Sequence, residues 1–584
     1  MTMAHTLKIS AGQYSDKGRK DVNQDFHGIL VPKEPQLTTK GIAIALADGI
    51  GSSEVSQVAS KFAVLGFLDD YYCTSEAWSV KRSVERVLTA TNAWLHSRTR
   101  QSQHRYDKDK GYVCALSALV IKSTTAHIFH VGDTRIYRVL GRALEQLTED
   151  HRVWVAEGQS YLSRAVGFNA QIEIDYQTLQ LEKGDVFLLA SDGVYEFLDA
   201  AFMADTIQRG RADLDQAART LVEEAFQRGS DDNLTVQIVV IDELPVQGVG
   251  EVVGEVQQQL SALALPPVLE ARATLDGYRI VREVHGNSRS HIYLAEDMDS
   301  GALVIIKTPS IDLQGDPVYL ERFLMEEWVA RRINSAHVLK PCVQTRERHY
   351  LYVATEFIDG QTLAQWMIDN PRPDLETVRG IVEQIAKGLQ AFHRLEMLHQ
   401  DLRPNNIMID KTGTVKIIDF GATSVAGIVE MRPPQEVADI LGTAQYTAPE
   451  YFLGDTGTER SDLFSLGVIT YQMLCGRLPY GAEVAKARTS SAQSRLQYVS
   501  VLEDDREIPV WLDGVLCKAV HPNPLKRYEA LSEFVQDLRH PNHAFLSKTR
   551  PALVERHPVR FWKSVSAVLA VIILLLLYGQ FGLR

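Results

Sequence analysis

The sequence changes character at residues 243 to 274, and this break constrains the fold more than any other feature. The stretch includes QGVGEVVGEVQQQLSALALPPVLEA, which is poor in aromatic residues and contains a proline pair at positions 266 and 267. We interpret it as a linker with room for one short helix. Because 584 residues are too many for one hydrophobic core, the break predicts at least two domains.

The two sides of the linker have different patterns. Before it, short runs rich in β-branched residues alternate with helical patterns, which predicts sheets flanked by helices. These helical patterns lie near residues 54 to 68, 79 to 98 and 214 to 228. After it, residues 275 to 310 resemble strands, and helical periodicity follows at 321 to 334, 376 to 394 and 460 to 476. We therefore expect a small sheet lobe followed by a larger helical lobe.

Composition narrows the classes of function. The chain is 45% hydrophobic and has a formal charge of −13, which indicates folded protein and argues against a nucleic-acid partner. Its five cysteines are scattered and have no metal-ligand spacing. This pattern favours a reducing compartment over a disulfide scaffold.

The C-terminal segment is strongly apolar. Residues 564 to 583 have no charge and include VLAVIILLLLY, and a helix of that length is about 30 Å long, roughly the thickness of a bilayer core. We interpret them as a transmembrane helix, the alternative being a buried helix of a globular core. Residues 541 to 563 form a basic juxtamembrane segment, and only Arg584 follows the apolar span. The positive-inside rule then predicts a single-pass protein of the cytoplasmic membrane with both domains in the cytoplasm.

Four acidic segments in the first half share a pattern. Asp25 lies in VNQDFHG, Asp48 in ALADGIG, Asp192 in LASDGVYEF and Asp232 in GSDDNLTV. Three of them place an aspartate, followed by Gly or Asn, at the end of an apolar strand. One such segment is an ordinary turn, but four predict carboxylates that share a cleft. Carboxylates brought together repel one another unless cations are present, and hard oxygen ligands favour Mg²⁺ or Mn²⁺.

The order of these segments, with VGDTRIYR, LTEDH and LSRAVG, resembles the metal-dependent protein phosphatases of the 2C type over residues 7 to 242. The resemblance implies an α/β sandwich of two sheets flanked by helices. It also implies two metals that activate a water for attack on phosphoserine or phosphothreonine. The implied metal residues are Asp25, Asp48, the carbonyl of Gly49, Asp192 and Asp232, with Asp133 at a third, weaker metal. Lys20 stands where the family usually has a phosphate-binding Arg, so a weaker hold on the substrate phosphate is expected.

The second half contains LHQDLRPNNIMID (398 to 410), KIIDFGATS (416 to 424) and TAPE (447 to 450). These segments resemble the protein kinase family over residues 275 to 540, which implies a bilobal fold that uses ATP with one or two Mg²⁺ or Mn²⁺ ions. The implied roles are Asp401 as base, Asn406 and Asp419 as metal ligands, Lys307 as phosphate-binding lysine, and Arg403 as a cation near the transferred phosphate. Glu326 is the expected partner of Lys307, with Glu327 as the alternative. Glu450, Asp462 and Arg527 match scaffold positions.

The expected glycine-rich flap over ATP is degenerate. It reads HGNSRS (285 to 290) and its one glycine is Gly286, whereas the three glycine positions of the family align with His285, Asn287 and Ser290. Glycine lets backbone amides approach the phosphates, so this flap predicts weak ATP affinity.

Together these features predict a membrane-anchored, bifunctional signalling enzyme that phosphorylates and dephosphorylates Ser and Thr of protein substrates. The linker would also let the phosphatase reach the kinase's own activation loop, which makes the chain itself a candidate substrate. The alternative is an active phosphatase fused to a pseudokinase that serves as nucleotide sensor or scaffold. The presence of Lys307, Asp401, Asn406 and Asp419 favours an active kinase.

Overall fold

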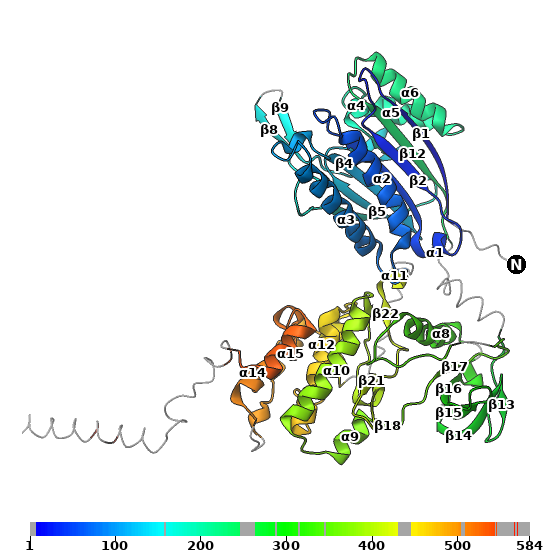
Figure 1. Cartoon of the computed structure of the whole chain (residues 1–584), viewed down its shortest axis with the longest axis vertical. Coiled ribbons are helices and arrows are strands. Elements are labelled where there is room, and N and C mark those ends of the chain that lie inside the picture. Colours follow the sequence, from blue (N-terminus) through cyan, green and yellow to red (C-terminus); the bar gives the residue numbers. More distant parts are fainter. Residues whose placement is uncertain are drawn as a thin grey trace, which may run out of the picture.

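The computed structural model describes residues 7–156, 159–245, 263–286, 289–313, 316–343, 346–429, 445–503 and 508–542, and three single residues beyond them. Figure 1 shows two bodies, residues 7–245 and 263–542, which meet near the short helix α11 (Ala426–Val429). The predicted transmembrane segment, 564 to 583, lies almost entirely outside the described residues, as does most of the basic segment before it. None of the helices within the described ranges is both long and apolar enough to cross a bilayer.

The N-terminal domain contains two antiparallel five-stranded sheets. The first sheet has the order β1 (Lys8–Asp16), β12 (Leu234–Glu243), β11 (Val186–Ala190), β6 (Arg135–Leu140) and β7 (Ala143–Gln146). The second has the order β10 (Asp175–Gln180), β5 (Thr125–Val131), β4 (Cys114–Lys122), β3 (Ile42–Gly49) and β2 (Phe26–Leu30). The remaining elements are α1 (Gln36–Lys40), α2 (Ser56–Cys73), α3 (Val80–Gln101), α4 (Asp192–Tyr195), α5 (Ala200–Arg209), α6 (Leu214–Gln227) and the hairpin β8 (Arg152–Ala156) and β9 (Gln159–Leu162).

Strand β3 shows how this domain is layered. Its side chains alternate between two faces, as in every strand. Ile42, Ile44 and Leu46 pack between the two sheets, whereas Ala43, Ala45 and Ala47 pack beneath α2 and α3. Both faces are buried, which explains why this strand is an unbroken apolar run. The alanines are small enough to let the helices approach, and α5 and α6 cover the other sheet in the same way.

The C-terminal domain has two lobes. The small lobe is a five-stranded sheet with helix α8 (Pro317–Arg332) beside it, in the order β13 (Thr274–Leu275), β14 (Tyr278–Gly286), β15 (Ser290–Asp297), β16 (Leu303–Pro309) and β17 (Val353–Glu356). The helices of the large lobe are α9 (Leu363–Asp369), α10 (Leu375–His393), α12 (Glu459–Cys475), α13 (Ser490–Gln493), α14 (Val510–Ala519) and α15 (Leu531–Arg539). Its strands pair as β18 (Gly360–Thr362), β20 (Ile407–Asp410) and β21 (Val415–Ile417), and as β19 (Met397–Leu398) with β22 (Ser424–Val425).

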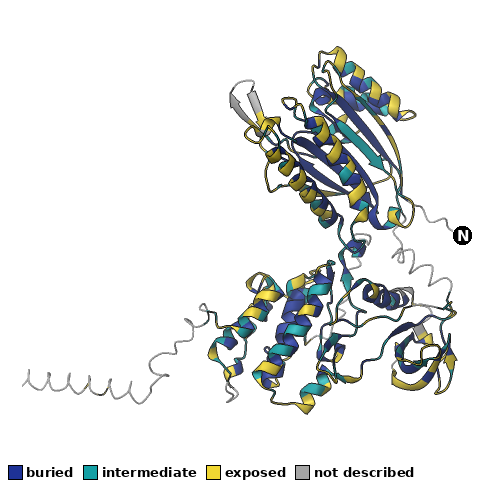
Figure 2. Ribbon diagram, in the orientation of Figure 1, coloured by how far each residue is buried: buried dark blue, intermediate teal, exposed yellow. Residues whose placement is uncertain are grey.

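Helix α10 shows why the large lobe forms. The Asp374 side chain accepts a hydrogen bond from the backbone N–H of Thr377 and caps the first turn. Apolar residues then recur at helical spacing on the buried face, namely Val378, Ile381, Val382, Ile385, Leu389 and Phe392. Figure 2 shows this buried face directed toward the centre of the lobe.

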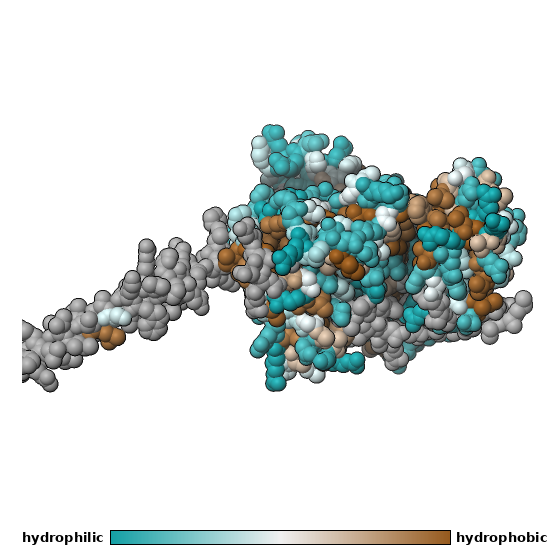
Figure 3. All heavy atoms as spheres, turned by 90° about the horizontal axis from the view of Figure 1, so that it is seen from below, coloured by the Kyte–Doolittle hydropathy of each residue, from teal (hydrophilic) through white to brown (hydrophobic). Residues whose placement is uncertain are grey.

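The predicted sandwich and the small and large lobes are confirmed, and the predicted helices agree with α2, α3, α6, α8, α10 and α12 to within a few residues. The end of the predicted linker differs, because Ala264 pairs with Tyr350 and Leu269 is buried in the core of the small lobe. Residues 263 to 274 therefore pack as part of the second domain. The face in Figure 3 is mainly hydrophilic, with its apolar residues in separate patches.

Candidate active sites

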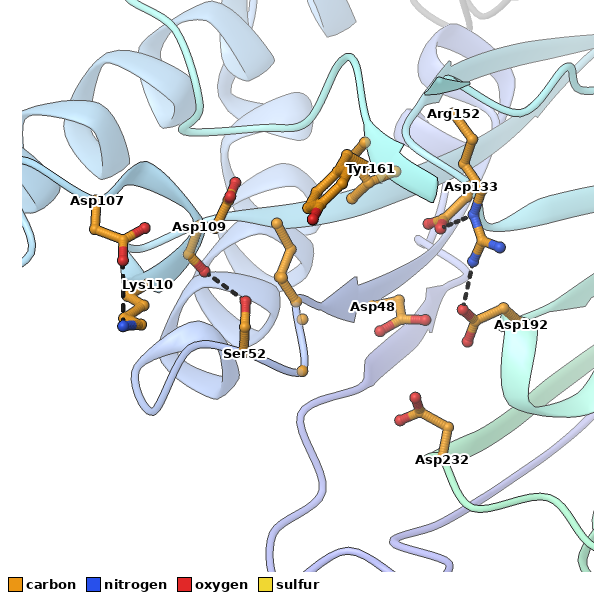
Figure 4. Close-up of a pocket in the computed structure, with 14 residues that line it drawn as sticks. Asp48, Ser52, Asp107, Asp109, Lys110, Asp133, Arg152, Tyr161, Asp192 and Asp232 are labelled. Atoms are coloured by element: carbon orange, nitrogen blue, oxygen red, sulfur yellow. Dashed lines mark hydrogen bonds and ion pairs between the residues drawn. The ribbon is translucent and has the colours of Figure 1, made fainter. Parts of the chain in front are cut away.

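The N-terminal domain has a cavity of about 470 Å³ where β3 ends. Four of the predicted metal-binding carboxylates and one predicted carbonyl line it, namely Asp48, Asp133, Asp192, Asp232 and Gly49. Figure 4 shows the four carboxylates around one space. Gly49 is closely surrounded, since a Cβ there would lie 2.8 Å from the Gln24 carbonyl oxygen. The predicted convergence of carboxylates is therefore present.

Asp25 lies beside this cavity but does not line it. Its Oδ2 accepts hydrogen bonds from Ser191 Oγ (2.9 Å) and Thr235 Oγ1 (2.7 Å). Burial raises the pKa of Asp25 to about 6 despite these bonds. Burial, reinforced by the neighbouring aspartates, also raises the pKa of Asp48 well above its ordinary value. Such repulsion among carboxylates is what a bound cation would relieve.

Arg152, at the start of β8, is the residue that sequence reasoning missed. Its Nε donates to Asp133 Oδ2 (2.7 Å), its Nη2 to Asp192 Oδ2 (2.7 Å) and its Nη1 to Glu196 Oε1 (2.8 Å). Figure 4 shows the guanidinium between the first two carboxylates. Nothing in the sequence around Arg152 gives its position, because the hairpin that carries it folds back over the cavity only in the tertiary structure.

The donor set, carboxylates and one backbone carbonyl, fits divalent cations. Within the described ranges, no three acidic, histidine or cysteine side chains form a ready metal site. Arg152 already holds two of the aspartates. However, Asp25 Oδ1 and Asp192 Oδ1 are buried and accept no hydrogen bond from the described residues. Buried oxygens without a donor are available for metal coordination. The predicted role of Asp133 at a third metal would require Arg152 to move.

Lys20 lies at the edge of the same cavity. Its Nζ is 3.3 Å from both carboxylate oxygens of Asp232. It is also close to Gly51, since a Cβ on that cavity-lining residue would lie 3.2 Å from Lys20 Nζ. A phosphate in the cavity would be within reach of this ammonium group, and the phosphate-binding role of Lys20 stays a prediction.

The second domain brings Lys307, Glu326 and Asp419 together between its lobes. Lys307 Nζ, on β16, contacts both carboxylate oxygens of Glu326, on α8, at 2.5 and 2.8 Å. Burial alone would lower the pKa of Lys307, but Glu326 and Asp419 raise it above its ordinary value. Burial alone would raise the pKa of Asp419, yet Lys307 helps to lower it to about 2. Lys307 and Asp419, the predicted metal ligand, are therefore both charged at neutral pH.

Glu326, the expected partner of Lys307, is confirmed in this position. The alternative, Glu327, is engaged elsewhere. Its carboxylate binds Arg331 (2.5 Å) and both terminal nitrogens of Arg348 (2.7 and 2.9 Å). Adjacent helical residues point in different directions, so only one of the two glutamates can face Lys307.

The loop that holds Asp401 is fixed from two sides. Asn406 Nδ2 donates to the carbonyl oxygen (2.9 Å) and to Oδ2 (3.0 Å) of Asp401. Buried Asp462 accepts the backbone N–H of His399 (2.9 Å) and of Gln400 (3.0 Å), so its predicted scaffold role is confirmed. Gln400 has φ 65°, which few non-glycine residues adopt, and these hydrogen bonds hold it there.

Arg403 and the second scaffold pair complete the large lobe. Arg403 lies two residues after the predicted base in the sequence. Its carbonyl accepts the backbone N–H of Asn406 (2.9 Å), which fixes the arginine backbone in the same loop. The predicted pair of Glu450 and Arg527 is also present, with two contacts of 2.7 Å and side chains that are 5% and 0% exposed. This pair is too deeply buried to meet a substrate, which agrees with a scaffold role.

The flap differs from a simple glycine-rich loop. Gly286 ends β14 and pairs with His291, and a Cβ on it would lie 2.2 Å from Glu283 Oε1. His291 Nδ1 also contacts this glutamate oxygen, at 2.9 Å. The glycine thus accommodates the Glu283 side chain, and a carboxylate close to the flap disfavours phosphate. Asn287 lies outside the described residues.

Comparisons with known proteins agree with this division. The family profile described as "Protein phosphatase 2C" matches residues 13–233, and the profile "Protein kinase domain" matches residues 280–541. The serine/threonine-protein kinase PrkC of Bacillus subtilis is 28% identical over 264 residues, which are 45% of this chain and 40% of PrkC. The serine/threonine-protein kinase Pkn1 of Myxococcus xanthus is 32% identical over 312 residues, which are 50% of this chain and 44% of Pkn1.

A solved structure of the S. agalactiae serine/threonine phosphatase is 25% identical, with a TM-score of 0.36, and covers 40% of this chain and 100% of that one. The chain spans less than half of the length of the two curated relatives. Each profile matches one of the two bodies in Figure 1. The chain therefore joins a protein phosphatase 2C domain to a serine/threonine protein kinase domain.

Proposed function

We propose that this protein is a bifunctional signalling enzyme that transfers phosphate from ATP to Ser or Thr of proteins and hydrolyses phosphoserine and phosphothreonine. One observation carries the proposal: each domain brings its own set of charged residues together. Lys307 pairs with Glu326 beside Asp419 in the kinase, and four aspartates line one cavity in the phosphatase.

In the kinase, the residues mainly position substrates and stabilise charge. Lys307, oriented by Glu326, would hold ATP phosphates. Asp401, held by Asn406, would accept the proton of the substrate hydroxyl, and Arg403 would neutralise charge on the transferred group. Asn406 and Asp419 would hold Mg²⁺ or Mn²⁺, which neutralises the triphosphate when bound. The packing of Gly286 around Glu283 supports weak nucleotide affinity, but not the pseudokinase alternative, since the pair of Lys307 and Glu326 is formed.

In the phosphatase, Asp48, Asp192, Asp232 and the carbonyl of Gly49 would hold two Mg²⁺ or Mn²⁺ ions, with Asp25 behind them. When bound, the cations supply charge neutralisation and acidify a water for attack on phosphorus. Lys20 would draw the phosphate into the cavity. Arg152 holds Asp133 and Asp192 in place, and its positive charge offsets the repulsion between these two carboxylates.

We also propose that residues 564 to 583 anchor the protein in the cytoplasmic membrane, with both catalytic domains in the cytoplasm. The support is the sequence, an uncharged span of bilayer length preceded by basic residues. Full-length protein should then be recovered with membranes and resist extraction by carbonate. Recovery in the soluble fraction would contradict the anchor.

The central experiment is radiolabelled phosphate transfer by the wild type, Asp401→Asn and Asp48→Asn, side by side. Asp401→Asn should lose incorporation of label from ATP and retain Mn²⁺-dependent release of phosphate from a phosphothreonine peptide. Asp48→Asn should show the reverse. Full phosphatase activity in EDTA would refute the metal mechanism, and absence of nucleotide binding by the wild type would refute the kinase assignment.

A further inference from the structure

The turn between α2 and α3 of the phosphatase domain is embedded in the kinase domain. Ala77, in this turn, is fully buried and belongs to the hydrophobic core of the kinase large lobe. Figure 1 shows α11, at the start of the activation segment, between the two bodies. The domains are thus in direct contact as well as joined by a linker.

Gly427, in α11, is bound by the phosphatase domain through both of its backbone polar groups. Its N–H donates to the Ala77 carbonyl oxygen (3.0 Å), and its own carbonyl accepts from Lys122 Nζ (2.6 Å). The Lys122 side chain is buried where it meets the kinase domain, and such burial strengthens a hydrogen bond from a charged donor. Both contacts fix the backbone of α11, which begins seven residues after Asp419.

A second group of contacts involves the segment before the catalytic loop. Glu396 Oε2 accepts from the backbone N–H (2.7 Å) and Oγ (2.8 Å) of Ser79, the N-cap residue of α3. A carboxylate at the N-terminus of a long helix is favourable. Trp78 Nε1 and Arg82 Nη2 each donate to the Arg394 carbonyl oxygen, at 3.1 Å. The segment bound here continues through β19 into the loop of Asp401.

A third contact reaches helix α8. Glu76 lies 3.3 Å from Arg332 in the last turn of that helix. Helix α8 also carries Glu326, the partner of Lys307. The phosphatase domain therefore contacts three kinase elements. One carries Glu326, and the other two are continuous in sequence with the segments that hold Asp401 and Asp419.

We propose that the phosphatase domain is a built-in activator of the kinase, which holds α8, the 394–396 segment and α11 in the catalytic arrangement. The proposal rests on the proposed kinase function. Its direction follows from the state of the docked structure, in which the ion pair of Lys307 and Glu326 is formed. Loss of docking would loosen all three elements and reduce the population of this state.

The phosphatase cavity lies at the other end of β3 from the contact. Ile42 pairs with Ile121, beside Lys122, whereas Asp48 pairs with Ala115. The seven steps from Ile42 to Gly49 correspond to about 23 Å. Docking therefore leaves the phosphatase cavity accessible and directed away from the kinase contact. The expectation that the linker brings it to the kinase's own activation loop stays a prediction, because residues 430 to 444 of that loop lie outside the described residues.

Gly427→Ala is a selective way to break the contact. A Cβ at this position would lie 2.4 Å from the Glu76 carbonyl oxygen and 2.8 Å from that of Trp78. The φ of Gly427 is not positive, so alanine suits the kinase backbone itself. The matched control is Gly380→Ala in α10, where a Cβ would meet no atom within 4 Å.

The experiment compares full-length wild type, Gly427→Ala and Gly380→Ala. Hydrogen–deuterium exchange over residues 76 to 82 and 424 to 427 reports docking, peptide phosphorylation reports the kinase, and p-nitrophenyl phosphate hydrolysis with Mn²⁺ reports the phosphatase. Gly427→Ala should exchange faster at both segments and lose kinase activity about five- to fiftyfold, a typical range for coupling between sites. Its phosphatase activity should be unchanged, and Gly380→Ala should resemble the wild type.

Lys122→Met provides a second variant that leaves the kinase sequence intact, so a misfolded kinase domain cannot account for its effect. It should cause the same changes in exchange and kinase rate. Unchanged exchange in both variants would refute docking, and faster exchange with an unchanged or higher kinase rate would refute activation. If the wild type transfers no phosphate, the kinase function itself fails and the activator role fails with it, while the exchange data still decide docking.

Discussion

Replacement of Arg152 by glutamine tests whether an arginine stabilises the metal-free phosphatase cavity. The Arg152 side chain is 19% exposed, and its guanidinium binds Asp133 and Asp192, whose side chains are 9% and 21% exposed. Its third partner, Glu196, is 47% exposed and contributes little. The substitution keeps a polar amide but removes the one positive charge that neutralises these two aspartates within the described contacts.

The magnitude follows from burial. Removal of one partner from a buried ion pair costs about 3–5 kcal/mol, and the partial exposure of Asp192 places the expected loss near 3 kcal/mol. For a domain of this size, about 2–4 °C of melting temperature corresponds to each kcal/mol, so the phosphatase transition should fall by about 6–12 °C. Removal of the positive charge should also strengthen the binding of divalent cations in the cavity. At an assumed separation of about 6 Å, the repulsion between a divalent cation and this single positive charge amounts to about 1.4 kcal/mol even in water. That energy corresponds to a tenfold change in affinity.

The assay is calorimetry of the full-length protein in EDTA and in Mn²⁺, with titration calorimetry for Mn²⁺ affinity. Arg152→Gln should melt earlier than the wild type in EDTA, and Mn²⁺ should remove most of the difference. Arg138→Gln is the matched control, because Arg138 pairs with Asp185 at similar burial (18% and 13% exposed) away from the cavity. Its loss of stability should persist in Mn²⁺. Equal stability of Arg152→Gln and wild type in EDTA, or unchanged Mn²⁺ affinity, would refute the reasoning.

Three further predictions concern the buried ion pair of the kinase domain, the pH dependence of stability, and which molecule the phosphatase cavity acts on. Arg527→Met should destabilise the kinase transition by about 3–5 kcal/mol in urea, because it leaves the Glu450 carboxylate buried without its partner; a loss below about 1 kcal/mol would contradict this. Burial lowers the pKa of His127 to about 3 and of His130 to about 4, so the folded protein keeps them neutral while the unfolded chain takes up protons below about 6.5. Between pH 6.5 and 5, stability should therefore fall by about 1.6 kcal/mol for each histidine, and each His→Gln variant should lack its share in urea titrations at both pH values. Finally, the chain should remove its own autophosphorylation between molecules, since the cavity faces away from the kinase contact. After ATP removal, the rate constant for loss of phosphate should therefore rise in proportion to protein concentration. A rate constant independent of concentration would indicate dephosphorylation within one chain.

Local sequence determines most of the two folds. The alternating apolar residues of β3 bury both of its faces, and the helical spacing in α10 produces one buried face. Asp48 and Asp192 follow apolar strands, so their place at the edge of a sheet could be predicted. The pairing of Lys307 with Glu326 could be predicted in the same way, because each lies on a strongly patterned element.

The features that escaped prediction depend on contacts between segments far apart in the chain. Arg152 enters the cavity because its hairpin folds over that cavity, and the hairpin sequence carries no sign of the contact. The sequence around Gly427 does not show that the glycine is needed for close approach of the turn between α2 and α3. Leu269 lies in a stretch with the composition of a linker, where apolar side chains show neither helical nor strand periodicity and so do not predict burial.

The arrangement of the two domains bears on how opposed activities can share one chain without cancelling each other. The contact at Gly427 and the cavity at Asp48 lie at opposite ends of the same sheet, so the kinase is held by one end of the phosphatase domain while substrates enter at the other. Under the proposed function, we therefore expect that a phosphate added by the kinase would not be delivered to the phosphatase of the same molecule. It would meet a phosphatase cavity by diffusion, on a substrate or on a second copy of the chain. The balance between the two reactions then depends on local concentration, which confinement to a membrane surface would raise.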